Sequence, residues 1–214
     1  MTDPLRGVDL EEGAYVSGHV PHIAPQAYLV RHPKGLDDEG LALAETEATR
    51  PMPSVYQEFL REMNGGRILN IDFYGLTGGM LLRDPTDPVG QPFSIAFDNE
   101  WYRRADNIPE GHFGFAAANG PLRTQGHFFL TSIGTVEMYH RDEDRIGKSW
   151  PSFSDFLLDE ITRRLAALDE RGKFQDTFQL LPGDTSDWEA RAEEKYLDSL
   201  SPFARMKRKI WRPR

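Results

Sequence analysis

The sequence contains no cysteine and no long uninterrupted apolar run. The absence of cysteine excludes disulfides, thiolate nucleophiles and zinc or iron–sulfur sites built on thiolates. No segment approaches the roughly 18 consecutive apolar residues that predict a membrane span, and the first residues lack the pattern of a secretory signal. We therefore expect a cytoplasmic protein with no membrane-spanning segment.

Motifs of common catalytic and cofactor sites are also missing. The chain has no H-E-x-x-H, EF-hand, P-loop, G-x-S-x-G or dinucleotide-binding fingerprint. His19 and His22 are separated by two residues, and His140 stands near Asp142 and Asp144, but no established metal-ligand spacing joins them. We therefore predict no metal site, no cofactor and no catalytic residues.

Acidic residues outnumber basic ones, 34 to 25, and the formal net charge is −9. The last ten residues nevertheless contain six basic ones, which are Arg205, Lys207, Arg208, Lys209, Arg212 and Arg214. An acidic body repels nucleic acid and attracts basic protein partners. The basic tail, which also holds Ile210 and Trp211, has three open interpretations: a solvated terminus, a contact to an acidic partner or nucleic acid, and a segment at a membrane surface.

Residues 51–66 predict the helix around which the rest is organised. Large apolar side chains recur there at helical spacing, at Tyr56, Phe59, Leu60 and Met63. We expect Ser54 and Gln57 to cap its start as an S-x-x-Q pair, and the Asn-Gly-Gly run at 64–66 to end it. This pattern on its own is typical of an amphipathic core helix.

A second helix is predicted over residues 149–168. Ser152 and Asp155 favour its start, and its apolar positions are Phe153, Phe156, Leu157, Ile161, Leu165 and Leu168. Between the two helices the pattern predicts a strand at 67–76, a strand leading into a short helix at 93–104, and a hairpin of 127–133 with 135–141 around Gly134. We interpret 142–145 as a charged link to the second helix.

Short strands between two helices, without a helix between successive strands, predict an α+β domain with a mostly antiparallel sheet. Before it, residues 1–25 have no periodicity, 26–32 form one short strand, and 35–49 form a helical or irregular approach. We expect a third helix near Trp188 and Tyr196. The predicted organisation is an N-terminal arm at 1–44, the domain at 45–168, and a C-terminal extension with the basic tail at 169–214.

The order of these motifs resembles the SUKH superfamily, which contains a fungal cell-wall-synthesis regulator and many bacterial immunity proteins. The first helix resembles the family's first helix at Pro53, Tyr56, Phe59, Leu60, Asn64, Gly65 and Gly66. The run from Phe113 to Gly120 and the following hairpin resemble its central strands. The family's W-x-S-F-x-x-F-L closing helix is matched by Trp150, Phe153, Phe156 and Leu157. The turn at 119–127 departs from the family pattern.

This resemblance implies a binding protein without catalysis or a cofactor, which neutralises the toxin domain of a bacterial polymorphic toxin in the cytoplasm. A regulatory protein–protein interaction module is the alternative. An enzyme of a different class, a hydrolase that uses a carboxylate or histidine pair, is the third hypothesis, with Asp98 and Glu100 beside Trp101 as its first candidates.

Two clusters are candidates for partner binding because interfaces favour Trp, Tyr and Arg at their centres and charged residues at their rims. Together they contain Asp98, Glu100, Trp101, Tyr102, Asp142, Glu143 and Asp144. An acidic surface of this kind is suited to cover the basic cleft of a toxin that cuts nucleic acid. The sequence predicts neither the identity of the toxin nor the oligomeric state.

Overall fold

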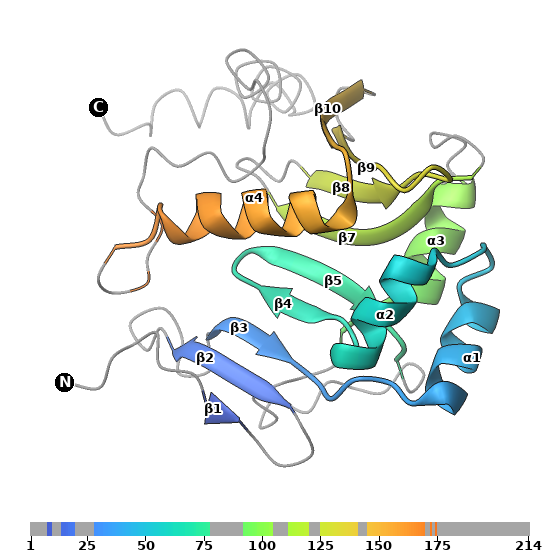
Figure 1. Ribbon diagram of the computed structural model, residues 1–214, viewed down its shortest axis with the longest axis horizontal. Helices are drawn as coiled ribbons and strands as arrows, with labels where there is room; N and C mark the ends of the chain where they lie inside the picture. The colour runs from blue at the N-terminus through green and yellow to red at the C-terminus, as the bar shows by residue number, and fades with distance from the viewer. Residues whose placement is uncertain are drawn as a thin grey trace, which may run out of the picture.

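The structure is a computed structural model, which describes residues 8–9, 14–19, 28–77, 92–104, 111–119, 125–140, 145–169, 172 and 174. In this part of the chain ten strands form one sheet, with the order β1-β2-β3-β4-β5-β7-β8-β9-β10 and with β6 beside β5 (Figure 1). All pairs are antiparallel except β5 with β6. The strands are β1 Val8–Asp9, β2 Tyr15–His19, β3 Tyr28–His32, β4 Gly66–Ile68, β5 Ile71–Gly75, β6 Phe93–Ser94, β7 Phe113–Asn119, β8 Gln125–Leu130, β9 Val136–His140 and β10 Arg145–Trp150.

Four helices are described, and two of them lie across the same face of the sheet. They are α1 Asp38–Glu47, α2 Ser54–Glu62, α3 Ile95–Arg104 and α4 Phe153–Leu165. Figure 1 shows α2 and α4 in front of the central strands, with α1 beside α2 and α3 at the end of the sheet. This arrangement confirms the prediction of an α+β fold in which a mostly antiparallel sheet is packed by an N-terminal and a C-terminal helix.

Aromatic rings fill the space between these two helices and the sheet. Phe156 lies 4.9 Å from Phe128, 5.1 Å from Trp150 and 5.3 Å from Phe115, measured between ring centroids. Phe153 of α4 also reaches Tyr56 of α2 at 5.9 Å. Offset and edge-on ring pairs add to the gain from burying apolar surface. Tyr56, Phe59 and Leu60 of α2 therefore meet Phe153, Phe156 and Leu157 of α4 in one core, whereas Leu165 is half exposed.

The start of α2 differs from the predicted capping pair. Pro53 occupies the N-cap position without a side-chain cap hydrogen bond, and Ser54 is already helical. Gln57 donates to Glu45 Oε1 and to Met52 O instead. At the other end the helix stops at Glu62, and the chain turns at Gly65 with φ of 66°.

The predicted single strand at 67–76 is a hairpin, because β4 and β5 turn at Leu69 and Asn70. Leu69 adopts a φ of 56°, a conformation that favours glycine. Because a leucine occupies the position, the sequence does not indicate this turn. The predicted second helix is also shorter than 149–168, since Trp150 belongs to strand β10 and α4 begins after the Ser152 cap. Arg145, which we expected in a link, begins that strand.

The N-terminal residues add more sheet than expected, because β1 and β2 continue the sheet beyond β3. The predicted hairpin around Gly134 is confirmed as β8 and β9, with Gly134 at φ of 85°. The expected helix near Trp188 and the basic tail lie outside the described residues. The predicted boundaries at 44 and 168 stay predictions.

Candidate functional site

An open cleft of about 1130 Å³ lies where α2 and α4 begin. Four segments line it: the α1–α2 connection with the first turn of α2 at 49–55, residues 111–112 before β7, the β8–β9 turn at 131–134, and the start of α4 at 152–154. These segments are far apart in sequence, and the sheet register brings them to one end of the central strands. The fold thereby builds a cleft from loops and helix ends, where binding residues usually lie.

The two helices enter this cleft with the same short pattern, a proline followed by serine. The Ser152 hydroxyl accepts from the backbone N–H of Asp155 at 3.1 Å and so caps α4, whereas α2 has no side-chain cap. A helix start carries unpaired N–H groups and a partial positive charge. The cleft is therefore rich in hydrogen-bond donors.

Arg50 joins two of the walls. Its Nη1 donates to the carbonyl of His112 at 2.7 Å, and the His112 Nε2 atom lies 3.2 Å from Glu137 Oε2. The His112 Nδ1 atom is buried without a hydrogen-bond partner among the described residues. His112 and Glu137 form the histidine–carboxylate pair beside the cleft, and sequence reasoning missed both residues.

Backbone strain occurs in the same wall. Thr49 follows the end of α1 with a φ of 59°. A β-branched residue rarely adopts this left-handed conformation, and such positions often lie at functional sites. The sequence pattern does not indicate this conformation, which the described chain shows at one other non-glycine residue, Leu69.

Tyr56 fixes the base of α2 beneath the cleft. Its hydroxyl lies 2.5 Å from the Tyr74 carbonyl and 3.0 Å from the Phe115 carbonyl. Burial raises the pKa of Tyr56 well above its usual range, although the hydrogen bond to Tyr74 opposes the shift. The phenol therefore stays neutral and acts as a structural donor between α2, β5 and β7.

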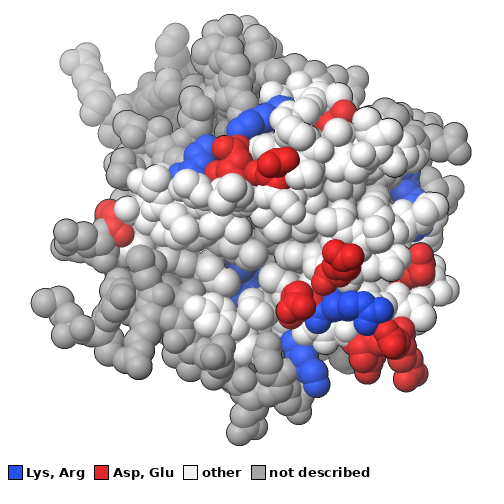
Figure 2. All heavy atoms as spheres, viewed as in Figure 1, with Lys and Arg blue, Asp and Glu red and all other residues white. Residues whose placement is uncertain are grey.

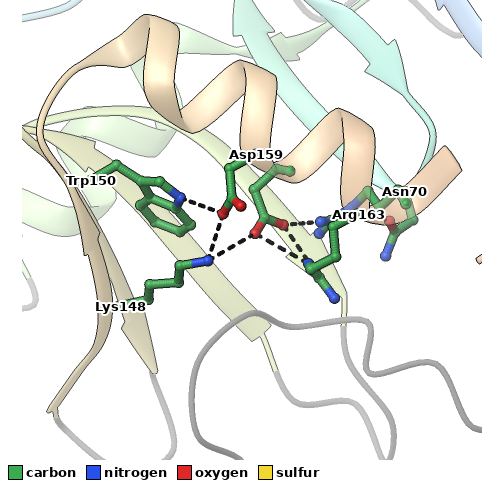
Figure 3. Close-up of polar contacts among 7 residues, drawn as sticks. Asn70, Lys148, Trp150, Asp159 and Arg163 are labelled. Atoms are coloured by element: carbon green, nitrogen blue, oxygen red, sulfur yellow. Dashed lines mark hydrogen bonds and ion pairs between the residues drawn. The ribbon is translucent and has the colours of Figure 1, made fainter. Parts of the chain in front are cut away.

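A second polar group surrounds the later turns of α4. We call it the α4 charge cluster, and its residues are Asn70, Lys148, Trp150, Asp159, Glu160, Arg163 and Arg164. Figure 3 shows Lys148 and Trp150 of β10 reaching Asp159, at 2.5 Å from Nζ and 2.8 Å from Nε1. Glu160 and Arg164 are both fully buried, and Arg164 Nη1 donates to Glu160 Oε2. Arg164 also donates from Nε to Asn70 Oδ1 at 2.6 Å.

The charges of this cluster are largely paired. Arg163 Nη2 lies 2.9 Å from Glu160 Oε2, and burial lowers the pKa of Arg164 to about 9, against the attraction of Asp159. Burial works to raise the pKa of Asp159, but hydrogen bonds from Lys148 and Trp150 and the positive charges nearby outweigh it and lower the pKa. These shifts describe an internal ion-pair network, and such networks perturb pKa values without catalysis.

None of the predicted partner-binding residues is among the described residues that line the cleft. Asp98, Glu100, Trp101 and Tyr102 belong to α3, where Asn99 anchors the helix by donating to the Gly114 carbonyl at 2.9 Å. Of these four, Glu100 has a described side chain, which is half-buried. Asp142, Glu143 and Asp144 lie outside the described residues. Their role in binding stays a prediction.

The motif residues of the two helices are placed as follows. Tyr56 and Leu60 are fully buried, Phe59 and Leu157 pack against the same core, and Phe153 and Phe156 meet them from α4. Asn64 pairs with Leu76 through both ends of its amide, at 2.9 and 2.8 Å, and so ties the end of α2 to the end of β5. Gly65 and Gly66 lie so close to neighbouring backbone that a side chain there would collide.

The described residues contain no group of three or more His, Asp or Glu side chains arranged to hold a metal ion. Among the described helices, none has the length and apolar character that a membrane crossing needs.

Fold and cleft together define a single-domain α+β protein with a loop-built cleft at one end of its sheet. This protein belongs to the SMI1 / KNR4 family (SUKH-1), whose family model matches residues 35–159. The match confirms the resemblance to the SUKH superfamily. No curated protein and no solved structure matches the chain. Membership fits an immunity-type or regulator-like protein that acts through protein–protein contacts, in a family that is generally non-catalytic.

Proposed function

We propose that this protein is a non-catalytic, cytoplasmic immunity-type protein that neutralises a cognate bacterial toxin domain by direct binding. The observation that carries the proposal is the open cleft on a scaffold of the SUKH-1 family. Ile133 stands at the rim of this cleft with 83% of its surface exposed. A bound protein that covers this side chain would bury its apolar surface and gain affinity from it.

Binding would act stoichiometrically, by covering the active site or an essential surface of the toxin. The rim contributes Ile133 and the wall contributes the half-buried Val55, and hydroxyl groups of serine and threonine also line the cleft. Apolar contacts of this kind supply affinity when they are fully covered, while the hydroxyl groups and backbone N–H groups orient the bound segment. No proton transfer or covalent step is required.

The test is to co-express the protein with the toxic domain encoded beside its gene and to measure both cell survival and complex formation. We expect survival together with a stable one-to-one complex. Ile133→Asp should weaken the complex, because it places a charge in the covered rim, whereas Leu158→Asp is the matched control on α4, where Leu158 is also exposed. A complex that tolerates Ile133→Asp as well as Leu158→Asp would contradict the role of the cleft.

Two other outcomes would redirect the proposal. A specific complex with a protein that is not a toxin, without any protection, favours a regulatory interaction module. Protection without a complex favours catalysis, and the His112–Glu137 pair would then be the first candidate, since its atoms lie 3.2 Å apart at the cleft. His112→Gln separates these cases when binding is measured beside survival, because loss of protection with unchanged complex formation is expected only if the imidazole reacts.

A further inference from the structure

The cleft differs in charge from the chain that forms it. The protein has a net charge of −9, yet none of the sixteen described residues that line the cleft is acidic. Arg50 is the fully charged residue among them, and His112 is the other residue able to become positive. Figure 2 shows acidic residues gathered over other parts of this face, around α1 and α2 and along α4. Among the described residues that line it, the cleft thus carries only basic charge, whereas the protein as a whole is acidic.

Arg50 is held in place with most of its donors available. One bond from Nη1 to the His112 carbonyl, at 2.7 Å, fixes the half-buried guanidinium between two walls. A guanidinium has five N–H donors in a rigid fork that matches a carboxylate in two parallel hydrogen bonds. No contact to another described residue occupies the remaining donors. Glu137, the nearest acid to His112 in the described structure, is already engaged by that imidazole.

The surroundings of Arg50 select for a carboxylate on a protein rather than for a free anion. Val55, which is half-buried, and Ile133, which is exposed, give the cleft apolar surface in addition to the Arg50 guanidinium. A small ion leaves this apolar surface in water, whereas a peptide loop covers it. The uncapped first turn of α2 adds donors to the same cleft, which favours negative charge further.

We propose that the cleft receives an acidic side chain, Asp or Glu, carried on a loop of the partner protein. The carboxylate pairs with the Arg50 fork, and an apolar neighbour of the acid covers Ile133. This inference rests on the proposed function and specifies its chemistry. The partner surface as a whole complements the acidic body of the protein, and one acid within that basic surface provides the register and the specificity.

The test is to titrate the cognate toxin domain with the wild-type protein, Arg50→Gln and Arg61→Gln by calorimetry. Arg61 is the matched control because it is an exposed arginine on α2, paired with Asp38 at 2.7 Å. Loss of a desolvated charged contact weakens binding by at least about 30-fold, so we expect that loss for Arg50→Gln and less than about a threefold change for Arg61→Gln. Arg50→Lys, which keeps the charge and loses the fork, should lie between them.

A scan of the toxin identifies the acid. Each Asp or Glu on its surface is replaced by Asn or Gln, and one replacement should weaken binding as much as Arg50→Gln does, with no further loss when the two are combined. Thermal unfolding of each variant shows whether the fold is kept. If Arg50→Gln is unfolded, Arg50→Lys replaces it in the comparison.

The outcomes separate the two proposals. A toxin that does not bind the wild-type protein overturns the proposed function. A toxin that binds wild type and Arg50→Gln equally overturns this inference alone. Thermal protection of the wild-type protein by inorganic phosphate, lost in Arg50→Gln while toxin binding is unchanged, would identify a free-anion site and would also overturn it.

Discussion

Helix α4 packs on one sheet with two chemically different halves. Its first half inserts Phe153 and Phe156 into the aromatic core next to the cleft, whereas its second half buries Glu160 and Arg164 completely. These four side chains are all buried, but burial of a ring is favourable by itself, while burial of a charge is favourable only if a partner compensates it. The first half therefore stabilises the fold even though an open cleft lies beside it. The contribution of the second half to stability depends on each buried charge keeping its partner.

The largest expected effect comes from the first half. Phe156→Ala removes a fully buried ring that contacts Phe115, Phe128 and Trp150, and should lower the free energy of unfolding by about 3–5 kcal/mol in urea titrations. Leu158→Ala is the control two residues away, because 72% of the Leu158 surface is exposed and its loss should change stability by less than about 0.5 kcal/mol. Equal effects at both positions would show that the described core is misplaced.

The second half should respond to a change of charge with almost no change of volume. Glu160→Gln leaves the buried guanidinium of Arg164 without its carboxylate partner. We expect a loss of about 3 kcal/mol in the free energy of unfolding. Glu58→Gln on the exposed side of α2 is the matched control and should change little.

A double replacement sharpens this comparison. Glu160→Leu combined with Arg164→Met fills the same space without charge, and should recover most of the loss that Glu160→Gln causes. If the double variant is as unstable as Glu160→Gln, the ion pair itself stabilises the fold, and the contrast between the two halves of α4 disappears.

The first half of α4 could be predicted from the sequence and the second half could not. Aromatic residues at helical spacing identified Phe153 and Phe156, because apolar periodicity reports which side of a helix faces the core. The same rule placed Leu165 in the core, but half of its surface is exposed and Arg164 is buried instead. A buried arginine needs Glu160 and Asn70, and Asn70 lies 94 residues away in a turn that the sequence did not indicate.

The cleft escaped prediction for a related reason. Its walls come from four separate segments, and residues such as Arg50 and His112 stand in no recognisable motif. The partner-binding residues predicted from the sequence lie instead in two local clusters of aromatic and acidic residues, at 98–102 and 142–144. Local clusters can be read from a sequence, whereas a cleft depends on the sheet register that brings loops together.

A moderate effect is expected at Thr49, in the wall of the cleft. Thr49→Gly removes the strain of a β-branched residue at φ of 59° and should raise the free energy of unfolding by about 1 kcal/mol, measured by urea titration. Thr49→Ala is the control. It also removes the hydroxyl and methyl groups, but it keeps Cβ on a residue at positive φ, so the free energy of unfolding should rise much less. If glycine brings no more gain than alanine, the left-handed conformation of Thr49 carries no strain.

The smallest expected effect is a pH dependence in the α4 charge cluster. The folded state lowers the pKa of Asp159, so its carboxylate stabilises the fold above the ordinary Asp pKa of about 3.9, and this contribution disappears as the pH falls through the lowered value. The difference in stability between wild type and Asp159→Asn should therefore be constant near neutral pH and shrink in strong acid. Almost half of the Asp159 side chain is exposed, which keeps the difference small.

In a Lys148→Met background the same replacement should matter less at every pH, because Lys148 provides the charged contact to Asp159. An acid transition that is identical with and without Asp159 would place the pH sensitivity of the fold outside this cluster.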